Sequence, residues 1–167
     1  MLDYLLLIIF PGAMAFAAAM DLITMTIPNR VSIVLVAAFF VLAPLAGLGL
    51  QDMSLHIAAG CVTLVVGFVF FSRGWMGGGD AKLCAAAALW LGFEHLITFA
   101  LVSALLGGAL TLALLFLRKF PLPLSLVGQT WIVRLHNVQE GIPYGIALGA
   151  AGLIVYPSTA WMPPLIH

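Results

Sequence analysis

The sequence predicts an all-α, polytopic membrane protein: a bundle of about six transmembrane helices. Of its 167 residues, 64% are hydrophobic and only 7% are charged, whereas soluble domains carry about 25% charged residues. Six basic and six acidic side chains cannot cover the surface of a water-soluble domain of this size. Disorder requires low hydrophobicity, and a zero net charge without a basic stripe argues against nucleic-acid binding. The bilayer is therefore the predicted solvent.

Six apolar runs, most of them close to the roughly 20 residues that a span requires, give the helix count. They lie at about residues 4–20, 31–50, 55–72, 81–93, 96–117 and 143–161. The fourth run is short and rich in alanine, and Gly92 near its end indicates that it does not cross the bilayer fully. Residues 118–142 form the one long polar connection, for which a short interfacial helix and a plain loop remain open. No repeat is evident, so we expect a single domain over residues 1–167.

Charge asymmetry orients the bundle. With six spans, loops 21–30, 73–82 and 118–142 share one side of the membrane. They contain all six basic residues, namely Arg30, Arg73, Lys82, Arg118, Lys119 and Arg134. The positive-inside rule places such loops in the cytoplasm and both termini on the outer side.

The acidic residues divide by side as well. Asp3, Asp52 and Glu94 fall at predicted outer helix ends, where solvation is a sufficient role. Asp21 and Asp80 fall at cytoplasmic ends of spans, and carboxylates near the membrane interior are candidates for function. On position alone, a snorkelling or helix-capping role is equally open, and Asp80 could cap the fourth helix.

The surroundings of the two aspartates favour chemistry. Three glycines, Gly77 to Gly79, precede Asp80 and allow a second chain to approach closely. Both carboxylates can lie at one depth, and two carboxylates held together share a single proton. One can then take a proton from water while its protonated partner polarises a carbonyl. This is aspartic-protease chemistry, and it requires neither metal nor cofactor.

Three sequence blocks carry a family resemblance. They are Asp21 followed by Ile27-Pro28-Asn29, the segment Trp75 to Leu83 with Gly77-Gly78-Gly79-Asp80 inside it, and Gly141-Ile142-Pro143-Tyr144-Gly145. Their order, each at a predicted cytoplasmic helix end, resembles the type IV prepilin peptidases, which are GxGD-type intramembrane aspartyl proteases. The resemblance covers essentially the whole chain.

The resemblance implies that Asp21 and Asp80 are catalytic. It also implies a substrate, a prepilin or pseudopilin precursor whose short basic leader is removed at the cytoplasmic boundary of a bacterial inner membrane. Further residues of the same blocks are candidates for substrate binding or active-site support: Asn29, Gly77, Gly78, Gly79, Lys82, Pro143, Tyr144 and Gly145. Each has a structural alternative: Lys82 as a positive-inside anchor, Asn29 as a turn residue, and Pro143 as the first residue of a helix.

The chain resembles the short form of the family. Bifunctional members carry paired CxxC motifs in an additional region that methylates the new N-terminus, whereas Cys61 and Cys84 form no CxxC. We therefore expect no methyl transfer and two small buried cysteines. CpaA/TadV-like peptidases of Tad (Flp-type) pilus systems are the preferred relatives, with archaeal preflagellin peptidases as the alternative.

Two other classes of function remain as alternatives. Carboxylates at the edge of the membrane can bind cations or relay protons in a small transporter. A non-catalytic subunit of a pilus assembly machine is the third hypothesis. Neither predicts that an Asp-to-Asn substitution abolishes cleavage of a leader.

Overall fold

The computed structural model describes residues 2–161, and within them every regular element is helical. The elements are α1 (Leu2–Thr24), α2 (Asn29–Leu45), α3 (Leu50–Ser72), α4 (Gly78–Leu117), η1 (Leu124–Leu126), α5 (Thr130–His136), η2 (Val138–Glu140), α6 (Tyr144–Val155) and η3 (Tyr156–Ser158). The predicted all-α class is confirmed. The two ends of the predicted domain, Met1 and residues 162–167, lie outside the described residues.

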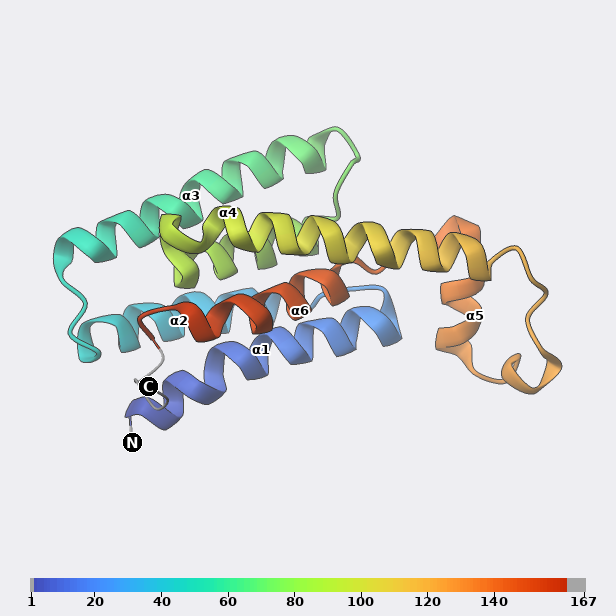
Figure 1. Cartoon of the computed structure of the whole chain (residues 1–167), viewed down its shortest axis with the longest axis horizontal. Helices are drawn as coiled ribbons and strands as arrows, with labels where there is room; N and C mark the ends of the chain where they lie inside the picture. The colour runs from blue at the N-terminus through green and yellow to red at the C-terminus, as the bar shows by residue number, and fades with distance from the viewer. Residues whose placement is uncertain (1, 162–167) are drawn as a thin grey trace.

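The long helices lie side by side along one axis, and the short α5 lies beyond the ends of α2, α3 and α6, beside the C-terminal end of α4 (Figure 1). Helix α1 packs against α2 and α6, while α4 packs against α2, α3 and α6. On α6, Gly149 and Gly152 lie under α1: a Cβ on Gly149 would be 2.7 Å from the Met14 carbonyl oxygen. Because α6 lacks side chains on this face, the two helices approach closely.

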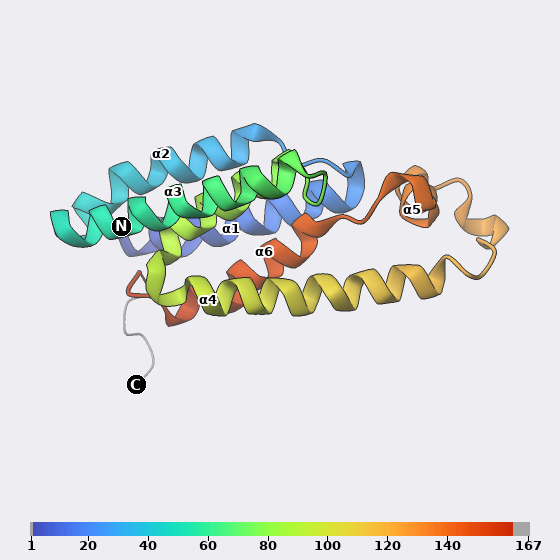
Figure 2. The same ribbon diagram turned by 90° about the horizontal axis from the view of Figure 1, so that it is seen from above.

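Helix α4 is broken into two arms at Gly92, whose φ of 66° and ψ of 179° are not helical. The chain reverses there, so the first arm runs away from the α5 end and the second arm returns toward it (Figure 2). The first arm, residues 78–91, extends only roughly 21 Å at 1.5 Å per residue, less than the roughly 30 Å of a hydrocarbon core. The short length of this arm is consistent with the predicted incomplete fourth span, which stays a prediction.

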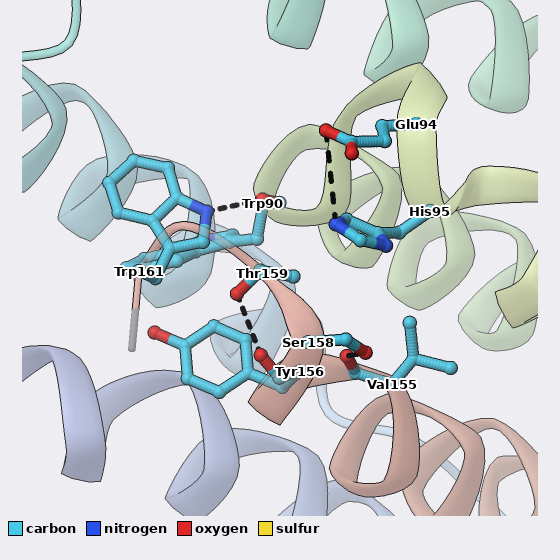
Figure 3. A network of polar contacts seen from close by, with 8 residues as sticks. All are labelled: Trp90, Glu94, His95, Val155, Tyr156, Ser158, Thr159 and Trp161. Carbon is cyan, nitrogen blue, oxygen red and sulfur yellow. Dashed lines mark hydrogen bonds and ion pairs between the residues drawn. The ribbon is translucent and has the colours of Figure 1, made fainter. Parts of the chain in front are cut away.

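Side chains bind the carbonyl groups that this break leaves free. His56 Nδ1 is 2.9 Å from the Leu89 carbonyl oxygen, and the Trp161 indole donates to the Trp90 carbonyl oxygen (Figure 3). Trp90 also donates its own indole N–H to the Leu35 carbonyl oxygen of α2. Buried carbonyls need such partners. These three hydrogen bonds join the end of the first arm to α2, to α3 and to the segment after η3.

Several predicted boundaries require correction. Helix α1 continues to Thr24, so Asp21 lies within its last turn rather than after it. Helix α3 begins at Leu50, so residues 51–54 are helical and not a loop. The break between the fourth and fifth runs falls at Gly92, two residues before the predicted Glu94-His95 link. Apolar content alone does not mark these ends, because polar residues are accommodated in terminal turns.

The outer surface of the bundle is apolar. Among residues 2–161, three helices are long and apolar enough to span a membrane, Tyr4–Thr24, Leu50–Ser72 and Gly78–Leu117, and two more apolar helices are shorter. Large apolar side chains such as Phe68, Leu105 and Leu112 are exposed. Such continuous exposure is not tolerated in a water-soluble monomer, and a membrane location follows.

Candidate active site

Asp21 lies in the last turn of α1 and is almost completely buried, with 5% of its surface exposed. Its Oδ2 accepts a hydrogen bond from the backbone N–H of Gly145 at 2.6 Å. Gly145 is the second residue of α6, and first-turn N–H groups have no partner within their own helix. The carboxylate of α1 thus binds a free donor at the start of α6.

The glycine at position 145 is a steric requirement of this contact. A Cβ there would lie 2.8 Å from Asp21 Oδ2 and 2.7 Å from Ile27 Cδ1. Any larger residue would therefore displace the carboxylate or the Ile27 side chain. This gives a physical role to the last glycine of the third sequence block.

Asp80 lies in the first turn of α4, directly after the three glycines. The N-cap of α4 is Gly77, with extended φ and ψ, so the helix begins three residues earlier than predicted and Asp80 is its third residue. From the third helical position the carboxylate folds back over Gly77, where a Cβ would be 2.9 Å from Asp80 Oδ2. A carboxylate in this turn is also favoured by the helix dipole.

Ile27 joins the two halves of the site. A Cβ on Gly79 would lie 3.2 Å from Ile27 Cβ, while the Ile27 Cδ1 atom is in contact range of Gly145. The connection between α1 and α2 therefore packs against the glycine segment of α4 and the start of α6 at the same time. Asp21 and Asp80, 59 positions apart in the sequence, come close enough for the charge of one to act on the other.

Asn29 and Lys82 form a second polar pair. Lys82 Nζ donates to Asn29 Oδ1 at 2.9 Å, and both side chains are exposed. The pair lies at the end of a largely apolar groove of about 700 Å³ between α2, α3 and the first arm of α4. The structure thus joins Asn29 to Lys82 and not to Asp21.

Pro143 and Tyr144 lead into the Asp21 contact. Pro143 is fully buried and is the N-cap of α6. It therefore directly precedes the helix, whereas the structural alternative makes it the first helical residue. The Tyr144 ring packs directly on Gly107 in the second arm of α4. The third block is therefore held by the second arm on one side and by α1 on the other.

Besides the two carboxylates, the described residues 2–161 contain two cysteines and further side chains of the kinds that bind metal ions. Cys61 and Cys84 are both free, and Cys61 is exposed in the groove, contrary to the expectation that both are buried. In residues 2–161, no three His, Cys, Asp or Glu side chains lie close enough together to hold a metal ion. The chemistry available at this end of the bundle is that of the two carboxylates and the backbone donor.

Two residues at this end have roles that the sequence does not indicate. Ile27 stands in the first sequence block, and its position two residues before Asn29 is the only signal. Arg118 is visible in the sequence solely as a positive charge, although its guanidinium donates to two backbone carbonyls. Contacts of this kind join segments far apart in sequence, and a single chain gives no sign of them.

The fold and site define a helical membrane protein with two carboxylates, Asp21 and Asp80, near one end of its bundle. The sequence model of the type IV leader peptidase family matches residues 8–112, which include both aspartates. The chain belongs to this family and is a prepilin-type leader peptidase. No curated protein and no solved structure gives a significant match.

Proposed function

We propose that this chain is a membrane-embedded aspartic endopeptidase whose catalytic residues are Asp21 and Asp80. The observation that carries the proposal is the buried Asp21 carboxylate, bound by Gly145 and within electrostatic range of Asp80. Burying a carboxylate in a membrane bundle is costly. Retaining two at one site is explained by a reaction that needs both.

The chemistry follows from a shared proton. The ionised carboxylate takes a proton from water as the water oxygen attacks the scissile carbonyl carbon, and the protonated carboxyl group donates to the carbonyl oxygen. Collapse of the tetrahedral intermediate breaks the C–N bond, and the leaving nitrogen receives a proton from the pair. The products are a leader with a new carboxyl terminus and a mature protein with a free amine. The two groups titrate as one unit.

The substrate we propose is a prepilin or pseudopilin precursor, cut between its short basic leader and its hydrophobic helix. Gly77, Gly78 and Gly79 leave room for an extended backbone beside Asp80. Asn29 and Lys82, at the end of the apolar groove, offer polar contacts to the segment that follows the cut. Pro143, Tyr144 and Gly145 support Asp21. The preference for Flp/Tad-type precursors rests on the sequence resemblance.

Cleavage on the cytoplasmic side is supported by charge. Asp21 lies at the end of α1 and Asp80 at the start of α4. The helix ends next to them in the bundle are the start of α2 and the ends of α3 and α4, which carry Arg30, Arg73 and Arg118. The positive-inside rule assigns such an end to the cytoplasm. We accordingly propose a bacterial inner-membrane enzyme, forming a single domain, with its active site at the cytoplasmic boundary.

The test is processing of a co-expressed prepilin by Asp21→Asn and Asp80→Asn variants. Each should insert into the membrane and abolish cleavage, because an amide can neither accept the proton of water nor share one with its partner. Ser103→Ala, a buried polar substitution in the second arm of α4 and outside the groove, serves as the control. Wild-type cleavage by either variant would remove that carboxylate from the mechanism, and cation flux in liposomes without cleavage would support a transporter.

A further inference from the structure

Arg118 lies at the C-cap of α4, where the chain leaves the second arm. Its Nε donates to the Leu135 carbonyl oxygen at 2.8 Å, and one terminal nitrogen donates to the Gly141 carbonyl oxygen at 2.6 Å. The side chain is partly buried. One guanidinium therefore holds both the last turn of α5 and the residue at which the chain turns back toward the bundle.

The segment from Gly141 to Gly145, which we call the strap, connects this anchor to the active site. Gly141 adopts a φ of 79°, in the left-handed region that favours glycine. Four residues further on, the N–H of Gly145 donates to Asp21. An extended chain of this length spans at most roughly 14 Å, so the two ends of the strap cannot lie further apart than this. Arg118 at one end thus limits where the donor at the other end can lie.

The middle of the strap is also held. Pro143 is fully buried, and the Tyr144 ring packs on Gly107 of the same α4 arm that carries Arg118. The second arm of α4 therefore contacts the strap twice, and the strap contacts Asp21 once. Loss of the Arg118 contacts would release the Gly141 end and leave Tyr144 as the remaining contact with this arm.

A positive charge at this boundary is already accounted for by membrane topology. Topology alone, however, does not require the two hydrogen bonds. The adjacent Lys119 carries the same charge and is exposed, and among residues 2–161 its side chain makes no hydrogen bond. Arginine offers several donors in a rigid fork, whereas lysine offers a single flexible ammonium.

We propose that Arg118 is a positioning residue for the peptidase reaction, which holds the strap so that the Gly145 N–H stays on the Asp21 carboxylate. The inference rests on the proposed function for its kinetic consequence. Its structural consequence, the protection of the Gly145 N–H, does not depend on catalysis.

Hydrogen–deuterium exchange of the full-length protein in detergent micelles tests the structural step. In Arg118→Gln, we expect amides of the strap and first turn of α6 to exchange about tenfold faster, because charged hydrogen bonds at the anchor are lost. Lys119→Gln removes the same charge and should exchange like the wild type. Arg118→Lys keeps the charge and should fall between them. The thermal midpoints should be similar, which separates a local release from global unfolding.

Cleavage kinetics on a purified prepilin test the functional step. Arg118→Gln should lower kcat by about ten- to a hundredfold with a KM within about twofold of wild type, because the catalytic carboxylate and not the substrate contact is displaced. Lys119→Gln should cleave normally. Gly141→Ala, which strains the turn without altering charge, should reproduce the Arg118→Gln result.

Equal exchange and equal kcat in Arg118→Gln and Lys119→Gln would overturn the proposal, as would a loss of kcat without faster exchange of the strap. If Arg118→Gln does not insert, Arg118→Lys and Gly141→Ala decide the question by the same criteria. Asp80→Asn is assayed alongside. Cleavage by that variant would refute the proposed dyad, while the exchange result for Arg118 would still stand.

Discussion

The backbone N–H of Gly145 and the Oδ2 atom of Asp21 lie 2.6 Å apart and join two helices across 124 positions of sequence. The N–H is an otherwise unpartnered donor at the start of α6, and the carboxylate is buried at the end of α1. Each group therefore satisfies the other. This contact places the third sequence block against the first.

Replacing Gly145 with alanine tests the contact directly. The new Cβ would lie 2.8 Å from Asp21 Oδ2, so the carboxylate must move. We expect kcat for prepilin cleavage to fall about 100-fold or more, as displacements of about 1 Å do at catalytic centres. Gly108→Ala is the matched control, since a Cβ there meets nothing within 4 Å. Comparable activity of the two variants would show that Asp21 tolerates displacement.

A second prediction concerns the break in α4. Gly92 and Gly47 both have positive φ, but only at Gly92 would a Cβ collide, 3.0 Å from the His56 ring. Gly47→Ala should destabilise the protein by about 1–2 kcal/mol from backbone strain alone, and Gly92→Ala should destabilise it more. Thermal unfolding in detergent measures the difference. Equal midpoints would mean that the His56 ring gives way without cost.

The indole of Trp161 provides a third test. Its N–H binds the Trp90 carbonyl oxygen in the network of Figure 3, and the ring is 4% exposed. Trp161→Phe keeps most of the packing but leaves a buried carbonyl without its donor, which costs about 1–3 kcal/mol. Trp75→Phe, at a residue 69% exposed, should be close to neutral. A neutral Trp161→Phe would indicate that another donor reaches the carbonyl.

The pair formed by Asn29 and Lys82 gives a fourth prediction. Because Lys82 Nζ donates to Asn29 Oδ1, we expect Asn29→Ala and Lys82→Ala each to raise KM about two- to fivefold. The double variant should be no worse than the worse single one, because either substitution already removes the pair. Steady-state kinetics on the same prepilin measure this. Fully additive effects would instead assign separate substrate contacts to the two residues.

Much of the site could be read from sequence. Asp21 and Asp80 stand out because a carboxylate next to an apolar run is rare and costly, and the glycines before Asp80 indicate close approach. The family match over residues 8–112 supports the class of enzyme, while the assignment of these two residues stays a prediction. The positions of Arg118 and Ile27 in the site could not be predicted, because their contacts cross between segments that local pattern does not connect.

The sequence by itself indicated that the protein lies in a membrane, that it is helical, that its fourth span is short, and that two carboxylates are candidates for the site. Those features depend on local composition, because each segment that enters the bilayer must be apolar and must form its own backbone hydrogen bonds. Only the tertiary structure decided that α4 turns back at Gly92, that Asn29 pairs with Lys82, and that Gly145 binds Asp21. These depend on which helix faces pack together, and small residues such as Gly149 settle that through close contacts between distant segments.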